Sequence, residues 1–346
     1  MILTDAEELT PLDDAVAIIG GGSFARAVGR VLSHTPADVR MWARRKAART
    51  HLKKSIQNVT VVDDLEEAVH RARLVVIGVS AAGLNDVASQ LGPILKGDQV
   101  LLHGVRGVGE DFVLPHDVIC RHTAARKIAV LGGPLYFDEL KHGRPLVALV
   151  ASKFRSVVDE IKALTQGTPV KVHGSHDVTG VELAGVMSNI THLATGLSNA
   201  LKFGETARGV LATHGLSEAQ ILGVHLGAQL STFSGLAGIA DLIPRPIKAT
   251  ARHHHLAKGL VDNVELDKLL DKADGSVEGV NSVREAAELA RKHKLTLPLI
   301  NALDEVLFHG RPPAEAIEEV LQLDLMLGQE ALRSSQLLPS GVSARG

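Results

Sequence analysis

Short apolar runs, rich in β-branched residues, alternate with stretches of helical periodicity along the first half of the chain. Each run has the length of a buried strand, and the stretches between them place apolar residues three and four positions apart. This alternation predicts a parallel, doubly wound sheet. The predicted strands are 15–19, 39–42, 59–61, 74–79, 99–103, 127–131, 146–150 and 170–173, with helices at 25–33, 82–92 and 154–164.

The pattern changes after about Ser175. Helical periodicity with small residues at the contact positions then runs through 177–201, 208–223 and 283–292, without a further convincing strand. We therefore predict a Rossmann-type α/β domain followed by an all-α C-terminal domain. The predicted boundaries are an N-terminal extension at 1–14, the Rossmann domain at 15–174, the helical domain at 175–333 and a disordered tail at 334–346.

Composition narrows the class of protein. The net charge of −2 and the 3% of aromatic residues argue against a nucleic-acid-binding surface. The single cysteine, Cys120, excludes an intramolecular disulfide and suits a reducing compartment. Apolar runs are far shorter than the roughly 20 residues that cross a bilayer, and the acidic N-terminus is unlike a signal peptide. We expect a cytoplasmic protein without membrane insertion.

A glycine-rich turn lies between the first predicted strand and the helix that follows it. Gly20 allows a tight turn, Gly22 lets the backbone approach a pyrophosphate, and Ala25 lets helix and strand pack closely. Backbone amides at the start of the helix, around Ser23 and Phe24, would face the phosphates. The turn predicts dinucleotide binding, and the alternative is a purely structural turn.

The residues after the second predicted strand bear on the choice of dinucleotide. An NAD-specific site usually has Asp or Glu there, to accept hydrogen bonds from the ribose hydroxyls. This chain instead has Arg44, Arg45 and Lys46. Three cations suit a 2′-phosphate, so we predict NADP as the preferred cofactor, with NAD as the second choice. The alternative is a solvated run of charges.

From Val16 to Leu323 the order of motifs resembles the NAD(P)-dependent glycerol-3-phosphate dehydrogenase family. The most diagnostic motifs are Gly-Val-Glu-Leu-Ala-Gly at 180–185 and Gly-Ile-Ala-Asp-Leu at 238–242. The other motifs lie at 19–25, 79–80, 104–107, 133–134, 143–145, 177–189, 235–237 and 277–280. The resemblance implies a C-terminal domain like that of 6-phosphogluconate dehydrogenase. Segments rich in small and apolar residues, together with the prevalence of two-fold symmetric assemblies, predict a homodimer.

In that family the N-terminal domain binds the dinucleotide and the helical domain closes over a polyol phosphate. The resemblance implies a catalytic lysine that is supported by an aspartate. It also implies a second lysine and an Arg-Asn pair that hold the substrate, and a glutamate that contacts the cofactor. The matching positions here are Asn189, Asp241, Arg252 and Glu278, whereas Ser188 and Arg106 replace the two lysines and His253 replaces the asparagine after the arginine. Ser80, after the fourth predicted strand, is a further expected cofactor contact.

These replacements change the available acid–base chemistry. Serine has no usable pKa near neutrality, and Arg106 stays protonated, so it can hold an anion or polarise a carbonyl but cannot act as a base. His192 lies four residues after Ser188, hence on the same helix face. His192 could serve as the acid–base group, either directly or through the Ser188 hydroxyl, and Asp241 could orient its imidazole. The alternative is an ordinary helix histidine.

Three further residues are interpreted by position. Arg252 and His253 are expected to face a phosphate or carboxylate, with a solvated basic stretch as the alternative. No metal site is expected at the run of histidines after Arg252, because consecutive residues on a helix point about 100° apart and cannot all bind one ion easily. Glu182, six residues before Ser188, is expected on the packed side of its helix.

The sequence thus favours an oxidoreductase that transfers a hydride between NADP(H) or NAD(H) and a small anionic alcohol or carbonyl. Glycerol 3-phosphate and dihydroxyacetone phosphate are the candidate substrates, held by Arg106 and Arg252. The alternative is a non-catalytic dinucleotide-binding sensor or assembly protein on the same fold.

Overall fold

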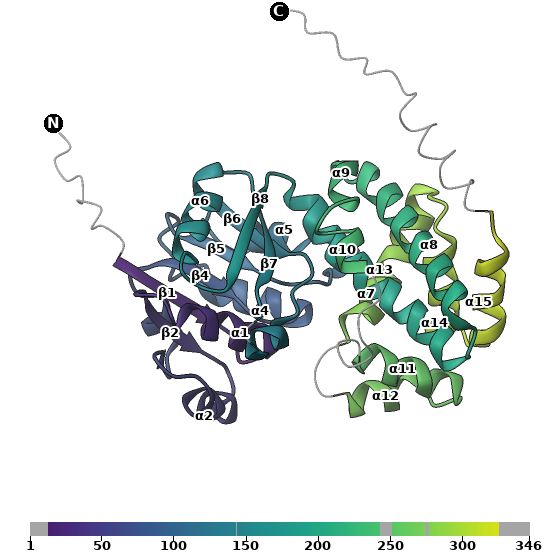
Figure 1. Ribbon diagram of the computed structural model, residues 1–346, viewed down its shortest axis with the longest axis horizontal. Coiled ribbons are helices and arrows are strands. Elements are labelled where there is room, and N and C mark those ends of the chain that lie inside the picture. Colours follow the sequence, from purple (N-terminus) through teal and green to yellow (C-terminus); the bar gives the residue numbers. More distant parts are fainter. Residues whose placement is uncertain (1–12, 143, 243–250, 274–276, 325–346) are drawn as a thin grey trace, which may run out of the picture.

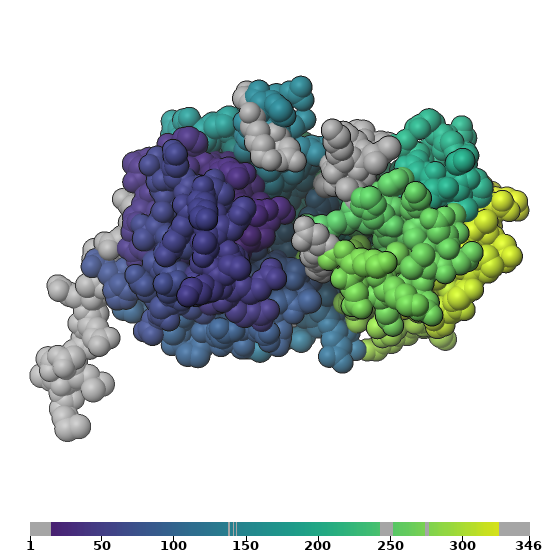
Figure 2. Space-filling model, turned by 90° about the horizontal axis from the view of Figure 1, so that it is seen from below, coloured from purple at the N-terminus to yellow at the C-terminus, as the bar shows by residue number. Residues whose placement is uncertain are grey.

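The computed structural model describes residues 13–142, 144–242, 251–273 and 277–324. An α/β part is followed along the chain by a helical part, and the two lie side by side (Figure 1). They meet along a furrow on the face seen in Figure 2. The predicted fold class is confirmed. The predicted C-terminal tail lies outside the described residues. So does the predicted N-terminal extension, except for its last two residues.

The α/β part contains an eight-stranded sheet with the order β3-β2-β1-β4-β5-β6-β7-β8. Its strands are β1 (Asp13–Ile19), β2 (Asp38–Trp42), β3 (Thr60–Val61), β4 (Ala72–Ile77), β5 (Val100–His103), β6 (Lys127–Gly132), β7 (Leu146–Ser152) and β8 (Val170–Ser175). Each overlaps a predicted strand. The pairs among β1 to β6 are parallel, and Ile19 is in register with both Trp42 and Ile77, so these strands end at one edge.

The sheet is not parallel throughout, and in this respect the prediction is wrong. Strand β7 runs antiparallel to β6, with Ala129 opposite Ser152, and β8 is parallel to β7. The connection from β6 to β7 contains the short 3-10 helix η2 (Phe137–His142) instead of an α-helix. A parallel crossover needs a longer connection, usually helical, whereas an antiparallel return does not. Strands β7 and β8 are joined through α6 (Arg155–Leu164).

Helices cover both faces of the sheet, which explains why its central strands are almost entirely apolar. One face packs against α1 (Ser23–Leu32), α2 (Lys46–Ser55) and α6, with Val28, Leu52 and Val158 in that core. The other face packs against α3 (Leu65–Val69), α4 (Ala81–Leu91) and α5 (Pro115–His122). The short 3-10 helix η1 (Glu110–Phe112) precedes α5.

After Ser175 the described residues form helices and no strand, as predicted. The helices are α7 (Val178–Ala200), α8 (Gly204–His225), α9 (Leu230–Phe233), α10 (Ile239–Leu242), α11 (Ala251–Val261), α12 (Leu266–Lys272), α13 (Glu278–His293), α14 (Pro298–Phe308) and α15 (Pro313–Gln322). The central helix α7 is buried on most of its surface, packed among α8, α11 and α13. Asp177 caps it, accepting the Gly180 N–H at 2.9 Å. In the described part of the chain, no helix is long and apolar enough to span a bilayer.

Candidate active site

The glycine turn after β1 has a backbone that only glycine adopts easily. Gly20 has a φ of 136°, and a Cβ at this position would lie 2.3 Å from the carbonyl oxygen of Gly78. The Gly20 N–H donates to the Trp42 carbonyl at 2.7 Å, and the Gly78 N–H donates to the Ile19 carbonyl at 2.8 Å. The turn is therefore held by the strands on both sides of β1.

The start of α1 is open toward solvent. Gly22 is its N-cap, no side chain among the described residues caps the helix, and Ser23 is exposed. A Cβ at Gly22 would meet only the Gly78 oxygen, at 3.8 Å, whereas one at Gly78 would lie 2.7 Å from the Cβ of buried Ala25. Phe24 packs edge-on against Phe137. Uncapped amides at the positive end of a helix fit the phosphates of a dinucleotide.

The two arginines after β2 are exposed. The Arg44 guanidinium lies 3.7 Å from the Asp86 carboxylate on α4, and both side chains are mostly in solvent, so this pair contributes little to stability. Arg49 fixes the backbone beneath them by donating to the carbonyls of Ala43 at 2.7 Å and Arg44 at 3.0 Å. The head groups of Arg44 and Arg45 thus remain available to an anion.

The same positive charge continues into α2, at the lower edge of the α/β part in Figure 1. Between positions 44 and 54 the chain has no Asp or Glu. We call the Lys and Arg residues of this segment the basic edge: Arg44, Arg45, Lys46, Arg49, Lys53 and Lys54. Of the α2 residues, only Leu52 is buried, so the helix is mostly solvent-facing.

Glu278 of α13 connects the helical part to the sheet domain. Its Oε1 accepts the Ala81 N–H at 2.9 Å, at the first turn of α4, where Ser80 is the N-cap but provides no side-chain bond. Burial raises the pKa of the Glu278 carboxyl, and the Ala81 N–H and the charges of Arg106 and Arg252 oppose that shift.

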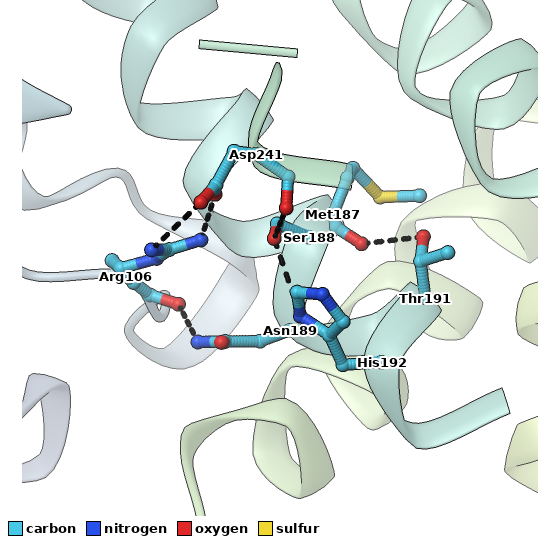
Figure 3. Close-up of polar contacts among 7 residues, drawn as sticks. All are labelled: Arg106, Met187, Ser188, Asn189, Thr191, His192 and Asp241. Carbon is cyan, nitrogen blue, oxygen red and sulfur yellow. Dashed lines mark hydrogen bonds and ion pairs between the residues drawn. The ribbon is translucent and has the colours of Figure 1, made fainter. Parts of the chain in front are cut away.

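A polar cluster lies where the connection after β5 meets α7 and α10 (Figure 3). The Arg106 guanidinium faces the Asp241 carboxylate with two nitrogens, one of them 3.5 Å from Oδ1 and the other in closer contact with Oδ2. The Asp241 side chain is 1% exposed and that of Arg106 is 21% exposed. A carboxylate this buried requires such a cation beside it.

Ser188 occupies the centre of the cluster. Its fully buried hydroxyl lies 3.3 Å from Nδ1 of His192 and donates to the backbone carbonyl of Asp241 at 3.5 Å. Asn189 donates to the Arg106 carbonyl at 2.9 Å. In Figure 3 the Asp241 carboxylate points toward Arg106 and its carbonyl toward Ser188. The fold thus brings together the residues predicted to be catalytic.

The first turns of α11 and α13 lie beside this cluster. The His253 ring is 6.2 Å from the His192 ring, centroid to centroid, and its Nε2 would lie 3.4 Å from a Cβ placed at Gly279. Arg252 is exposed, and its charge acts on Glu278. Within the described ranges, no three His, Cys, Asp or Glu residues are arranged to hold a metal ion.

Sequence reasoning placed Glu182 on the packed side of α7, where it is found, but missed its partners. Its Oε1 lies 2.9 Å from Nε2 of His103 and accepts the His116 N–H at 2.8 Å. Its Oε2 lies 2.6 Å from Nδ1 of His116. The available signal was weak: a histidine ending an otherwise apolar predicted strand.

A sheet with this glycine turn, joined to an all-helical domain that adds polar groups beside it, defines a two-domain dinucleotide-binding protein of the Rossmann class. Residues 15–158 match the family described as NAD-dependent glycerol-3-phosphate dehydrogenase N-terminus, and residues 177–318 match its C-terminus. The chain belongs to the NAD-dependent glycerol-3-phosphate dehydrogenase family, as the resemblance implied.

Individual relatives agree along nearly the whole chain. The glycerol-3-phosphate dehydrogenase [NAD(P)+] of Pelotomaculum thermopropionicum is 30% identical over 322 residues, which cover 88% of this chain and 92% of that protein. The corresponding protein of Moorella thermoacetica is 29% identical, covering 90% and 96%. A glycerol-3-phosphate dehydrogenase structure from Coxiella burnetii has the same fold, with a TM-score of 0.84 at 24% identity over 90% of this chain and all of that one.

Proposed function

We propose that this protein is an NAD(P)-dependent oxidoreductase that interconverts a small anionic alcohol and its carbonyl compound, with glycerol 3-phosphate and dihydroxyacetone phosphate as the first candidates. The names of its relatives support the reaction class. The observation that carries the proposal is the cluster in which Arg106, Ser188 and His192 lie together next to the dinucleotide-binding domain.

The cofactor would bind along the edge where β1, β2 and β4 end. Uncapped amides at Gly22, Ser23 and Phe24 would hold the diphosphate, and Ala25 keeps the helix close to the sheet. The exposed Arg44 and Arg45 head groups would hold a 2′-phosphate, which favours NADP over NAD. Ser80, the N-cap of α4, and Glu278 of α13, which accepts the Ala81 N–H there, complete the proposed cofactor contacts.

The substrate anion would be held by positive charge from both domains, with Arg106 after β5 in the sheet domain and Arg252 on α11 in the helical domain. Arg106 is partly exposed although it is paired with Asp241, and Arg252, with His253 beside it, begins α11. The Asn189 side-chain amide donates to the Arg106 backbone carbonyl and so fixes the Arg106 backbone. Arginine suits this role, because its fixed planar head group bonds carboxylates and phosphates with two nitrogens at once.

When bound, the nicotinamide accepts or donates the hydride. Oxidation of the alcohol also releases a hydroxyl proton, and reduction of the carbonyl consumes one. We propose that the Ser188 hydroxyl passes this proton to or from Nδ1 of His192, 3.3 Å away. Arg106 cannot exchange the proton, because guanidinium stays charged, but it can stabilise developing negative charge on the substrate oxygen.

Purified protein mixed with NADPH and dihydroxyacetone phosphate tests this function. We expect loss of the NADPH absorbance, and a decrease in kcat of roughly 10² to 10⁴ in Ser188→Ala and in His192→Gln. The double variant should be no slower than the slower single one, since both residues act on one proton. NADPH binding without turnover of this or related carbonyl phosphates would contradict the proposal and favour a non-catalytic sensor.

We also propose a homodimer, as the small and apolar composition of the helical domain suggested. Light scattering from the full chain tests it, with a mass of 36.6 kDa expected for a monomer and twice that for the proposed dimer.

A further inference from the structure

Glu182, His103 and His116 form a buried polar cluster that the proposed proton transfer does not use. The side chains of Glu182 and His103 are completely buried and that of His116 is 12% exposed. The three residues come from α7, β5 and α5, so the cluster connects the helical part to two elements of the sheet domain. A buried carboxylate with charge-assisted partners at both oxygens has a fixed orientation.

The charges in the cluster support one another. Burial alone would raise the pKa of Glu182, but the close contacts and the charges of His103 and His116 together outweigh it, and the pKa is lowered. Burial alone would lower the pKa of His116, but the hydrogen bond to Glu182 and the charges of Glu182 and Asp117 together outweigh it, and the pKa is raised. Among the described residues, Asp117 and Lys153 also act on His116, and the Cys120 thiol is nearby.

The position of Glu182 on α7 relates this cluster to Arg106. Glu182, Gly185 and Asn189 are three and four residues apart, so they share one face of the helix. Glu182 contacts His103, the last residue of β5, and Asn189 bonds the Arg106 carbonyl. Between them, a Cβ at Gly185 would lie 3.4 Å from Cγ of Arg106, so the helix backbone lies close to that side chain.

Helix α13 holds the far end of the same connection. Glu285 accepts the Phe112 N–H at 3.3 Å, and Asn281 donates to the Val108 carbonyl at 3.4 Å. Both Asp111 and Phe112 have positive φ values, of 58° and 56°, which non-glycine residues adopt only when their surroundings impose it. The connection from β5 to α5 is therefore shaped by side chains of the helical domain.

We propose that Glu182 is a positioning residue: by holding His103 and His116 it fixes the connection that follows β5, and with it the Arg106 guanidinium that faces Asp241. The catalytic consequence rests on the proposed function, in which Arg106 holds the substrate. The positioning itself does not depend on the proposed function, because it concerns the conformation of residues 104–109 in the protein without ligands.

Hydrogen exchange on the full chain tests the positioning without any turnover. In Glu182→Gln one neutral amide replaces the carboxylate, and we expect amide exchange in residues 104–109 to accelerate at least about tenfold. Exchange in the glycine turn at 20–25 should stay unchanged, as should the NADPH Kd. The matched control is Glu315→Gln, an exposed glutamate on α15, which should leave every peptide as in the wild type.

His116→Gln is the second variant, in case Glu182→Gln does not fold. It keeps the contact between Glu182 and His103, and we expect a smaller acceleration in the same peptide. Unchanged exchange at 104–109 in the variants that fold would overturn the proposal. So would equal acceleration throughout the chain, which is the signature of a merely structural role.

Kinetics separate this proposal from the proposed function. If the protein reduces dihydroxyacetone phosphate, Glu182→Gln should raise KM for that substrate about tenfold and change kcat less, because a displaced Arg106 weakens binding. Localised acceleration of exchange in a protein without turnover would support the positioning role and contradict the proposed function. Normal KM together with normal exchange would overturn the positioning role alone.

Discussion

At the scale of single residues, the Arg106–Asp241 pair sets the electrostatics of the site. The buried Asp241 carboxylate already has a cation beside it, and Ser188 adds a neutral hydroxyl at the position where the resemblance implies a lysine. Adding charge to one member of such a cluster therefore changes the others.

Replacing Ser188 by lysine tests whether the pocket still suits the family's substrate. A lysine there would be buried and next to a second cation, which lowers its pKa and makes it a better proton donor and acceptor near neutrality. We expect Ser188→Lys to increase kcat for dihydroxyacetone phosphate reduction about tenfold or more, measured by NADPH absorbance. Ser188→Met has similar length without the charge and should give no gain. Equal activity of the two variants would mean that the pocket accepts another substrate.

At the scale of elements, helix ends carry both the cofactor chemistry and part of the stability. Among the described residues no side chain caps the start of α1, whereas the Glu218 carboxyl group of α8 caps α14: it accepts the N–H groups of Leu299 at 2.5 Å and Ile300 at 3.0 Å. This contrast has a physical reason. A helix start that binds a ligand must keep its N–H groups open, whereas the N–H groups of a helix start in the core need hydrogen-bond partners within the protein.

The open end predicts a separation of binding from folding. Gly22 has an extended backbone and room for a methyl group, so Gly22→Ala should fold with nearly unchanged stability. That methyl would stand where the backbone must approach the diphosphate, and we expect the NADPH Kd to rise at least about tenfold. Gly209→Ala, at an open position on α8, is the control and should bind normally. An unchanged Kd for Gly22→Ala would place the diphosphate elsewhere.

The capped end predicts a pH dependence of stability. Burial raises the pKa of Glu218 from 4.5 to about 8, against the effect of its two N–H donors. Because the folded pKa is the higher one, this residue contributes most stability below pH 4.5, and the contribution is lost as the pH rises toward 8. The slope is at most about 1.4 kcal/mol per pH unit within that window.

Urea unfolding of wild type and Glu218→Gln at pH 5.5 and 7.5 measures this effect. The difference in unfolding free energy between the two proteins should shift in favour of the variant as the pH rises. A difference that is the same at both pH values would show that Glu218 does not titrate in this window. Glu315→Gln again serves as the control for a lost surface charge.

At the scale of the whole molecule, local sequence patterns predict the helices and strands. The features that these patterns do not predict depend on contacts between distant residues. The strands and the glycine turn were predictable because periodicity and turn chemistry are local properties of the chain. The reversal of β7 was not, because it depends on how the residues between β6 and β7 fold. Arg106 and Asp241 are 135 positions apart, and nothing local indicates that they pair.

The histidines around Glu182 show the same limit. Helical spacing places Glu182 on the buried face of α7, but only the packing of two domains brings His103 and His116 to it. A buried carboxylate in a sequence indicates that a partner exists without indicating which residue it is.

The basic edge has a consequence for how quickly the protein meets its cofactor. Six cations lie within positions 44–54 of a chain whose net charge is −2, so the other residues together have a net charge of −8. This uneven distribution favours a positive local potential at the basic edge. NADPH carries several negative charges and should be drawn to this end from a distance of about one Debye length, roughly 10 Å at 0.1 M salt.

Stopped-flow binding should therefore show an association rate constant that falls about tenfold between 20 mM and 500 mM salt, with little change in dissociation. Changing Lys53 and Lys54 to glutamate should reproduce the fall at low salt, since attraction at a distance requires no contact. If neither salt nor these substitutions slowed association, the charges on α2 would play no part in attracting NADPH.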